Sequence, residues 1–262
     1  MSRASGDVAS RGRLPLALPV AIGVAWAVAI GAAVSGRAGF LHHDALLQNG
    51  PPFRQALALF LASWLAMIIA MMLPSSLPMV RHYGAVAAKR GDPGALRSFL
   101  LGYAMVWTAF GVVAFLGDLA LHHLADRTPW VSAHPWVVAG SVLVVAGGFQ
   151  FSTLKERCLT QCRHPVAYLM RQYRRGIEDP LRLGVGHGLD CLGCCWALML
   201  LMFAAGVANL AWMAALAGVM LYEKVAPLGH RLTPVVGTVL LGWGTVVLLH
   251  PPWLPHPLAG VG

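Results

Sequence analysis

Hydrophobic residues in this chain gather into long runs, which short polar segments separate. A run of about 20 apolar residues is long enough to cross the hydrocarbon core of a bilayer as a helix. The pattern therefore predicts an all-α protein, a polytopic transmembrane helical bundle with about seven membrane spans. The predicted spans cover about Leu14–Ser35, Gln55–Leu73, Ser98–Leu121, Pro135–Phe151, Leu183–Ala205, Leu210–Tyr222 and Thr233–Leu249.

Turn-forming residues mark where the predicted helices end. Pro74 and Pro78 predict a break after the second span, because proline removes a backbone donor and clashes with the preceding turn. The segment Gly91-Asp92-Pro93-Gly94 interrupts the polar stretch that follows. Gly206-Val-Ala-Asn209 predicts a tight hairpin turn between the fifth and sixth spans. The longest hydrophilic segment, Ser152–Arg182, separates the fourth span from the fifth.

Composition supports a membrane protein with a single domain. The chain is 58% hydrophobic and 11% charged, whereas soluble domains average about 25% charged residues. We expect one transmembrane helical domain at 14–250, a cytoplasmic N-terminal tail at 1–13 and a Pro-rich C-terminal tail at 251–262. No small-residue cleavage site clearly follows the first apolar run, so the pattern favours a retained signal anchor.

The positive charges indicate an orientation. The net charge is +9, but the basic residues are concentrated in a few loops, as the positive-inside rule explains. No basic face with interleaved aromatic residues is present, so nucleic acid is not an expected partner. With the N-terminus in the cytoplasm, only Arg37, Arg54 and Arg127 of the nineteen Lys and Arg residues lie outside. We therefore expect a cytoplasmic N-terminus and an outer C-terminus.

The fifth span carries soft metal-binding side chains on one helical face. They are His187, Cys191, Cys194 and Cys195, at positions i, i+4, i+7 and i+8. Met199 and Met202 continue the stripe. Imidazole, thiolate and thioether groups bind copper(I), zinc or iron–sulfur centres, and an ionisable group within a membrane is a functional hypothesis by default. The alternative is that the cysteines pack as small hydrophobic residues.

The predicted orientation brings other candidate ligands to the same cytoplasmic leaflet. They are Met67, Met71, Met79, Cys158, Cys162 and Glu223. The spacings of Cys158 from Cys162 and of Cys191 from Cys194 both fit zinc sites. Plainer interpretations also stand: the methionines as core residues, Cys158 and Cys162 as surface thiols, and Glu223-Lys224 as a charge pair at a helix end.

Histidines predominate on the opposite side. Seven of the eleven are predicted there: His42, His43, His122, His123, His134, His250 and His256. They are either solvated loop residues or a capture site for metal that thiolates receive inside.

Five motifs together resemble a known family. They are Met71-Met-Leu-Pro-Ser-Ser-Leu-Pro-Met79, Leu154-Lys-x2-Cys158-Leu-x2-Cys162-Arg-x-Pro165, His187-Gly-x2-Cys191-Leu-Gly-Cys194-Cys195-Trp196-Ala-Leu-Met199, Asn209-Leu-x-Trp212-Met213 and Glu223-Lys224-x2-Pro227. Over about 64–227 the chain resembles the bacterial integral membrane proteins of domain of unknown function 2182, described as predicted metal-binding. The resemblance implies a multi-pass protein of the bacterial inner membrane, and it supplies no mechanism.

Three functions follow from these patterns. The first is a membrane metal-binding protein for copper(I), with zinc as the alternative, which serves transport, delivery or cofactor assembly and exchanges metal with a donor or acceptor protein. The second is a membrane thiol-disulfide oxidoreductase that uses the same cysteines. The third is a structural subunit whose cysteines only pack. No phosphate-binding loop or catalytic triad stands out, which favours a protein that is not an enzyme.

Overall fold

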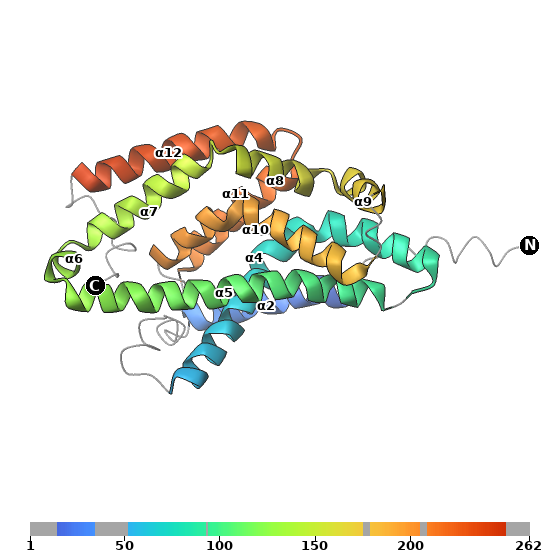
Figure 1. Ribbon diagram of the computed structural model, residues 1–262, viewed down its shortest axis with the longest axis horizontal. Helices are drawn as coiled ribbons and strands as arrows, with labels where there is room; N and C mark the ends of the chain where they lie inside the picture. Colours follow the sequence, from blue (N-terminus) through green and yellow to red (C-terminus); the bar gives the residue numbers. More distant parts are fainter. Residues whose placement is uncertain (1–14, 35–51, 93, 175–178, 205–208, 250–262) are drawn as a thin grey trace, which may run out of the picture.

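The computed structural model describes residues 15–34, 52–92, 94–174, 179–204 and 209–249, and the chain within these ranges is all helical (Figure 1). The helices are α2 (Ala17–Val34), α4 (Phe53–Arg90), α5 (Ala95–Arg127), α6 (Pro129–Ala133), α7 (Pro135–Phe149), α8 (Thr153–Arg163), α9 (Pro165–Arg174), α10 (Pro180–Ala204), α11 (Leu210–Val225) and α12 (Gly229–Leu249). The predicted all-α bundle is confirmed, and each of the seven predicted spans overlaps a helix. The two predicted tails lie outside the described residues.

Five of the described helices are long and apolar enough to cross a membrane, namely α2, α4, α5, α10 and α12. The pair α7 and α8 would add a sixth crossing as one broken span, bent by 63°. Helix α11, the predicted sixth span, has 16 residues, and its last turn extends past the predicted end at Tyr222 to include Glu223 and Lys224. The number seven for the membrane crossings stays a prediction.

Helix α4 continues through two prolines where the sequence predicts a break. It has 38 residues and holds Pro74 and Pro78 in its interior. Proline leaves the carbonyl four residues earlier without its helical N–H donor. For Pro74 that carbonyl belongs to Ala70, and Nε1 of Trp26 in α2 donates to it at 3.0 Å. The predicted break is wrong because a side chain from another helix satisfies the backbone group that proline frees.

The turn between α4 and α5 forms where Gly91-Asp92 predicts it. Gly91 ends α4 with a left-handed φ of 71°, a conformation that glycine adopts without strain. The side chain of Asp92 then accepts hydrogen bonds from the backbone N–H groups of Gly94 and Ala95. The predicted hairpin turn at 206–209 lies largely outside the described residues, although Asn209 caps α11 by accepting from the N–H of Trp212.

The main core lies between α4, α5, α10 and α11, and small residues let two of these helices touch. A Cβ atom at Gly102 of α5 would collide with the backbone carbonyl of Leu181, and one at Gly184 of α10 would collide with that of Phe99. Backbones approach this closely only where small residues line the contact. Glycine thus fixes the position of α10, which carries the three cysteines of the fifth span.

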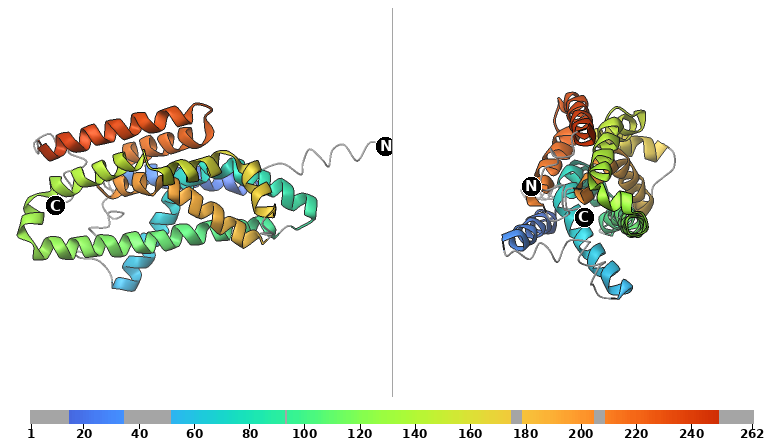
Figure 2. Two further views of the ribbon diagram at one scale, coloured as in Figure 1. Left: turned by 45° about the horizontal axis from the view of Figure 1, so that its top comes forward. Right: turned by 90° about the vertical axis from the view of Figure 1, so that its left-hand side faces the viewer.

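Helices α7 and α12 form a second close pair, as the right-hand view of Figure 2 shows. A Cβ at Gly147 would lie 2.7 Å from the backbone N of Leu241, and one at Gly244 would lie 3.0 Å from the backbone N of Val144. Gly140 and Gly237 are similarly crowded. Glycine on both helices therefore brings their backbones into contact.

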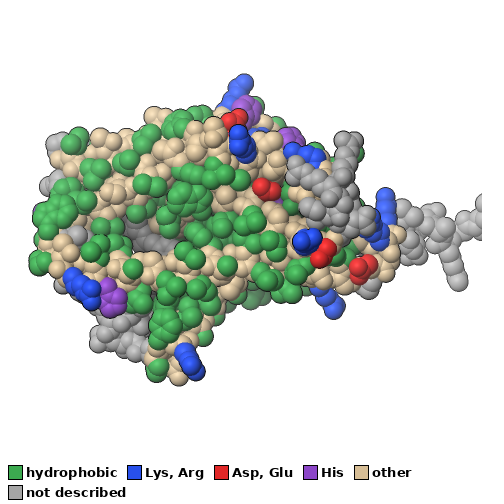
Figure 3. Space-filling model, viewed as in Figure 1, with side chains coloured by type: hydrophobic (Ala, Val, Ile, Leu, Met, Phe, Trp, Pro, Cys, Tyr) green, Lys and Arg blue, Asp and Glu red, His purple; other side chains and the backbone are tan. Residues whose placement is uncertain are grey.

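Charged side chains are unevenly placed over the surface. On the face shown in Figure 3, hydrophobic side chains cover the middle, and most Lys and Arg side chains gather toward the end where the N-terminal trace leaves the molecule. Such an asymmetry is typical of proteins that follow the positive-inside rule.

Candidate metal centre

Helix α10 buries its three cysteines together. Cys191, Cys194 and Cys195 have at most 1% of their surface exposed. The thiols of Cys194 and Cys195 donate to the carbonyl oxygen of Cys191 at 3.1 and 2.9 Å. The spacing of three and four residues that predicts one helical face therefore places all three thiols within one turn of the helix.

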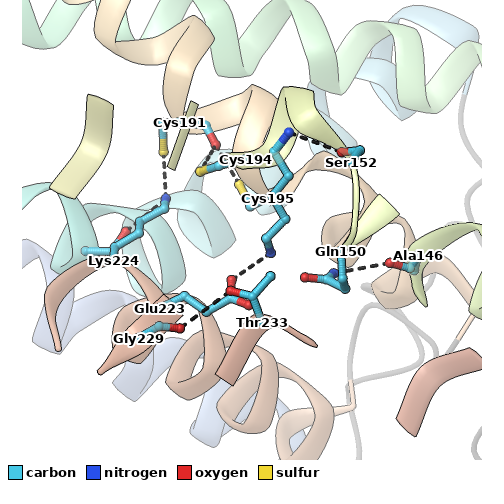
Figure 4. A network of polar contacts seen from close by, with 12 residues as sticks. Ala146, Gln150, Ser152, Cys191, Cys194, Cys195, Glu223, Lys224, Gly229 and Thr233 are labelled. Carbon is cyan, nitrogen blue, oxygen red and sulfur yellow. Dashed lines mark hydrogen bonds and ion pairs between the residues drawn. The ribbon is translucent and has the colours of Figure 1, made fainter. Parts of the chain in front are cut away.

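The Cys191 sulfur has polar partners from three other helices. Nζ of Lys224 in α11 lies 3.0 Å from Sγ, as Figure 4 shows. The hydroxyl of Tyr103 in α5 lies 3.3 Å away, and that of Ser76 in α4 lies 4.0 Å away. A small hydrophobic residue needs no such partners, so these contacts mark Cys191 as part of a polar site within the core.

A methionine of α4 extends the group of sulfur atoms. Sδ of Met72 lies 3.6 Å from Sγ of Cys195 and 4.0 Å from Nζ of Lys224. Met72 has no exposed surface. The continuous helix through Pro74 makes this contact possible, since it holds Met72, Ser75 and Ser76 on consecutive turns against α10 and α11.

Helix α8 supplies the remaining two cysteines. Cys162 is buried and interacts with the thiol of Cys194. Cys158 is only partly buried, and its sulfur lies so close to Gly193 of α10 that a Cβ there would collide with it. We call five of the buried sulfur-bearing residues the sulfur cluster, and Cys158 lies at its edge. The sulfur cluster consists of Cys162, Cys191, Cys194, Cys195 and Met72.

Glu223 lies next to Lys224 in sequence but makes a separate contact. Its Oε2 accepts a hydrogen bond from Nζ of Lys155 in α8 at 2.7 Å, and both side chains are buried. Arg163, at the end of α8, donates to the carbonyl oxygens of Ala226 and Pro227 beyond α11. The suggested charge pair between Glu223 and Lys224 is therefore not what the structure shows.

His187 lies one turn before Cys191 among aromatic rings. Its ring centroid is 5.7 Å from that of Tyr103, 5.9 Å from that of Phe99 and 6.1 Å from that of Tyr168. Its Nε2 is buried without a hydrogen-bond partner among the described residues. The hydroxyl of Tyr168 is directed to the carbonyl oxygen of Leu183 at 3.3 Å, and burial raises the pKa of this tyrosine. A buried, unpartnered imidazole nitrogen is consistent with the predicted ligand role, which stays a prediction.

The predicted methionines divide between two parts of the core. Met67 and Met71 belong to the same core as the cysteines. Met79 packs in a second core with Tyr83 and Phe99. Sequence reasoning did not choose Met72 as a ligand, nor did it foresee the roles of Tyr103 and Lys155. A signal for Met72 was present, because Ser75 and Ser76 follow it at helical spacing and carry polar groups along the same buried face.

Within the described ranges, no three His, Cys, Asp or Glu side chains are placed to hold one metal ion together. The thioether of Met72 adds a sulfur donor from α4 to the thiols of α8 and α10.

The histidines predicted on the outer side have separate contacts where they are described. His122 contacts the carbonyl oxygen of Asp118 at 3.0 Å, and the ring of His134 stacks on that of Trp130 at 4.8 Å. His123 is exposed near the end of α5. His42, His43, His250 and His256 lie outside the described residues. A capture site on this side stays a prediction.

A family model described as PpoB2, copper chaperone, matches residues 61–247. The chain belongs to the PpoB2 copper chaperone family. In this PpoB2-family chain the match begins within α4, ends within α12 and includes the whole sulfur cluster. The family indicates a copper-related function and supports the expected relationship to metal-handling membrane proteins. No curated protein and no solved structure matches the chain.

Proposed function

We propose that this protein is a membrane-embedded copper(I) chaperone that holds its cargo at the sulfur cluster and passes it to an acceptor protein. The observation that carries the proposal is the 3.6 Å contact between Sγ of Cys195 and Sδ of Met72. A metal–sulfur bond is about 2.3 Å long, so one ion can reach two sulfur atoms at this separation. Cys191, Cys194 and Cys162 offer further thiol ligands beside it.

The donor types favour copper(I) over zinc. Copper(I) is soft, accepts few ligands and binds thiolate and thioether groups. Structural zinc sites use four ligands, drawn from cysteine, histidine and carboxylate groups. No three such side chains in the described parts of the chain converge on one point. A site that combines the thioether of Met72 with cysteine thiols therefore suits copper(I), the softer of the two ions.

Membrane orientation and the route of the cargo belong to the same proposal. In this proposal the N-terminus lies in the cytoplasm and the cluster lies at the cytoplasmic leaflet of a bacterial inner membrane. The distribution of basic residues, including the charge asymmetry in Figure 3, supports this orientation. Cys158, the one partly exposed cysteine among the five, is the first contact for arriving or departing copper. The similarity to domain of unknown function 2182, over 64–227, falls inside the matched range 61–247. We infer that both describe the same part of the chain.

The proposal is tested by metal analysis of the full chain, purified in detergent under reducing conditions and loaded separately with copper(I) and zinc. The wild-type protein should retain copper(I), and Cys191→Ser should lose most of it while it elutes as folded protein. Serine is close in shape to cysteine but is a poor ligand for a soft metal. A chain with all five cysteines changed to serine provides the blank.

Two results would contradict the proposal. Full copper retention by Cys191→Ser would show that the cysteines of α10 only pack. A mixed disulfide with another protein, trapped through Cys194 in the same variant and visible on non-reducing gels, would instead indicate thiol–disulfide exchange.

A further inference from the structure

Lys224 is a buried lysine whose described partners include no carboxylate. It lies in the last turn of α11 with 5% of its surface exposed. Its Nζ contacts Sγ of Cys191 at 3.0 Å, Oγ of Ser75 at 3.3 Å and Sδ of Met72 at 4.0 Å. The nearest carboxylate in sequence, Glu223, is bonded to Lys155 instead.

Such surroundings are unusual for an ammonium group. Lysine is almost never fully buried unless it is paired, and a charge in a membrane interior is costly. Sulfur is a weak hydrogen-bond acceptor compared with a carboxylate. A packing role alone would be filled by methionine or leucine without this cost. The position of Lys224 therefore calls for an explanation that involves the sulfur atoms themselves.

We propose that the ammonium group of Lys224 stands in for the cargo: it occupies the space between Cys191 and Met72 in the metal-free protein and withdraws when copper(I) binds. This inference rests on the proposed copper(I) function. The ammonium group and copper(I) each carry one positive charge. Exchanging one for the other leaves the net charge of the buried sulfur cluster unchanged.

The location of Lys224 allows the withdrawal. Its flexible four-carbon stem can move the charged group while the backbone stays in place, and long basic side chains near helix ends extend toward water. The next residue, Val225, is 51% exposed, so the molecular surface begins one residue away. A divalent ion would leave one extra positive charge in the cluster after the same exchange, so this charge balance suits copper(I).

The test compares copper(I) affinities, measured by competition with a chromophoric copper(I) chelator, for the full chain in detergent. Lys224→Met should bind copper(I) about tenfold more tightly than the wild type, because a group hydrogen-bonded to the ligands no longer competes. Lys224→Gln should bind more tightly as well. Arg163→Met is the matched control. It removes a cation near the end of α11 that has no described contact with a sulfur atom, and it should leave the copper(I) affinity unchanged.

Each other result has a definite meaning. Equal or weaker copper(I) binding by both Lys224 variants would overturn the stand-in role while leaving the copper function intact. If only one of the two variants is recovered as folded protein, the copper(I) affinity of that variant decides between these outcomes. Loss of the fold in both would also overturn the inference, since copper loading must displace the ammonium group without unfolding the protein. A wild-type protein that binds no copper(I) would remove the proposed function, and this inference with it.

Discussion

Two buried lysines lie near the last turn of α11, one in α8 and one in α11 itself. The chemical groups that surround them differ. Lys155 lies 2.7 Å from a carboxylate oxygen of Glu223. Lys224 lies 3.0 Å from the sulfur of Cys191. The first region pairs opposite charges, as buried charges in a stable fold normally are. The second places a charge beside the sulfur atoms of a cysteine and a methionine. The difference teaches that burial alone does not reveal a functional site, whereas the chemical type of the partner does.

The largest expected loss of stability comes from breaking the charge pair. Lys155→Met leaves the carboxylate of Glu223 buried without its cation, which should lower the free energy of unfolding by about 3–5 kcal/mol. Copper(I) binding per folded molecule should not change, because Lys155 has no described contact with a sulfur atom. Denaturant unfolding in detergent measures the first quantity and chelator competition the second.

The double variant Lys155→Met with Glu223→Leu is the control for this prediction. Replacing both partners by apolar residues removes the unpaired charge and should recover most of the lost stability. A double variant as unstable as the single one would show that the pair is not the cause.

An intermediate loss of stability is expected when the hydrogen bond between Trp26 and α4 is removed. Trp26→Phe removes the donor to the carbonyl oxygen of Ala70 and should cost about 1–3 kcal/mol of unfolding free energy, the usual penalty for an unsatisfied buried acceptor. In a Pro74→Ala background, the restored N–H of residue 74 can bond this carbonyl within the helix. Thermal unfolding should be compared for the wild type, Trp26→Phe, Pro74→Ala and the double variant. The cost of Trp26→Phe should disappear in the Pro74→Ala background. An unchanged cost would refute this account of the proline-containing helix.

The smallest effect on stability is expected within the sulfur cluster. Leucine has nearly the volume of methionine, so Met72→Leu should change the unfolding free energy by less than about 1.5 kcal/mol. The same substitution at Met79, which packs in the second core, is the matched control. Met72→Leu should weaken copper(I) binding while Met79→Leu does not, as chelator competition can measure. Equal copper(I) affinities in the two variants would assign Met72 to packing.

The sequence was sufficient for the features that depend on local spacing. Apolar runs of sufficient length predicted the helices, and the period of 3.6 residues placed His187 and the three cysteines of α10 on one face. The turn at Gly91 was also predictable, because glycine there adopts a conformation that other residues avoid.

Features that depend on a distant partner were not predictable in this way. The helix survives Pro74 because Trp26 bonds to a carbonyl 44 residues away in sequence. Glu223 pairs with Lys155, 68 residues away, so its adjacency to Lys224 was misleading. Met71 and Met72 are neighbours in the sequence, and only the packing of α4 against α10 decides which sulfur meets Cys195. The helical period fixes how the side chains of one helix are directed relative to one another. It does not determine which of them face a neighbouring helix.

The glycine-lined contact between α7 and α12 also bears on how the protein is synthesised. Helix α12 begins 94 residues after α7 begins. At a synthesis rate of roughly 5–20 residues per second, α12 follows α7 out of the ribosome by roughly 5–20 s. Throughout that interval the glycine face of α7 lacks the helix against which it finally packs. The closure of this pair is therefore a late event in biogenesis, completed only after the cysteines of α8 and α10 have already been translated.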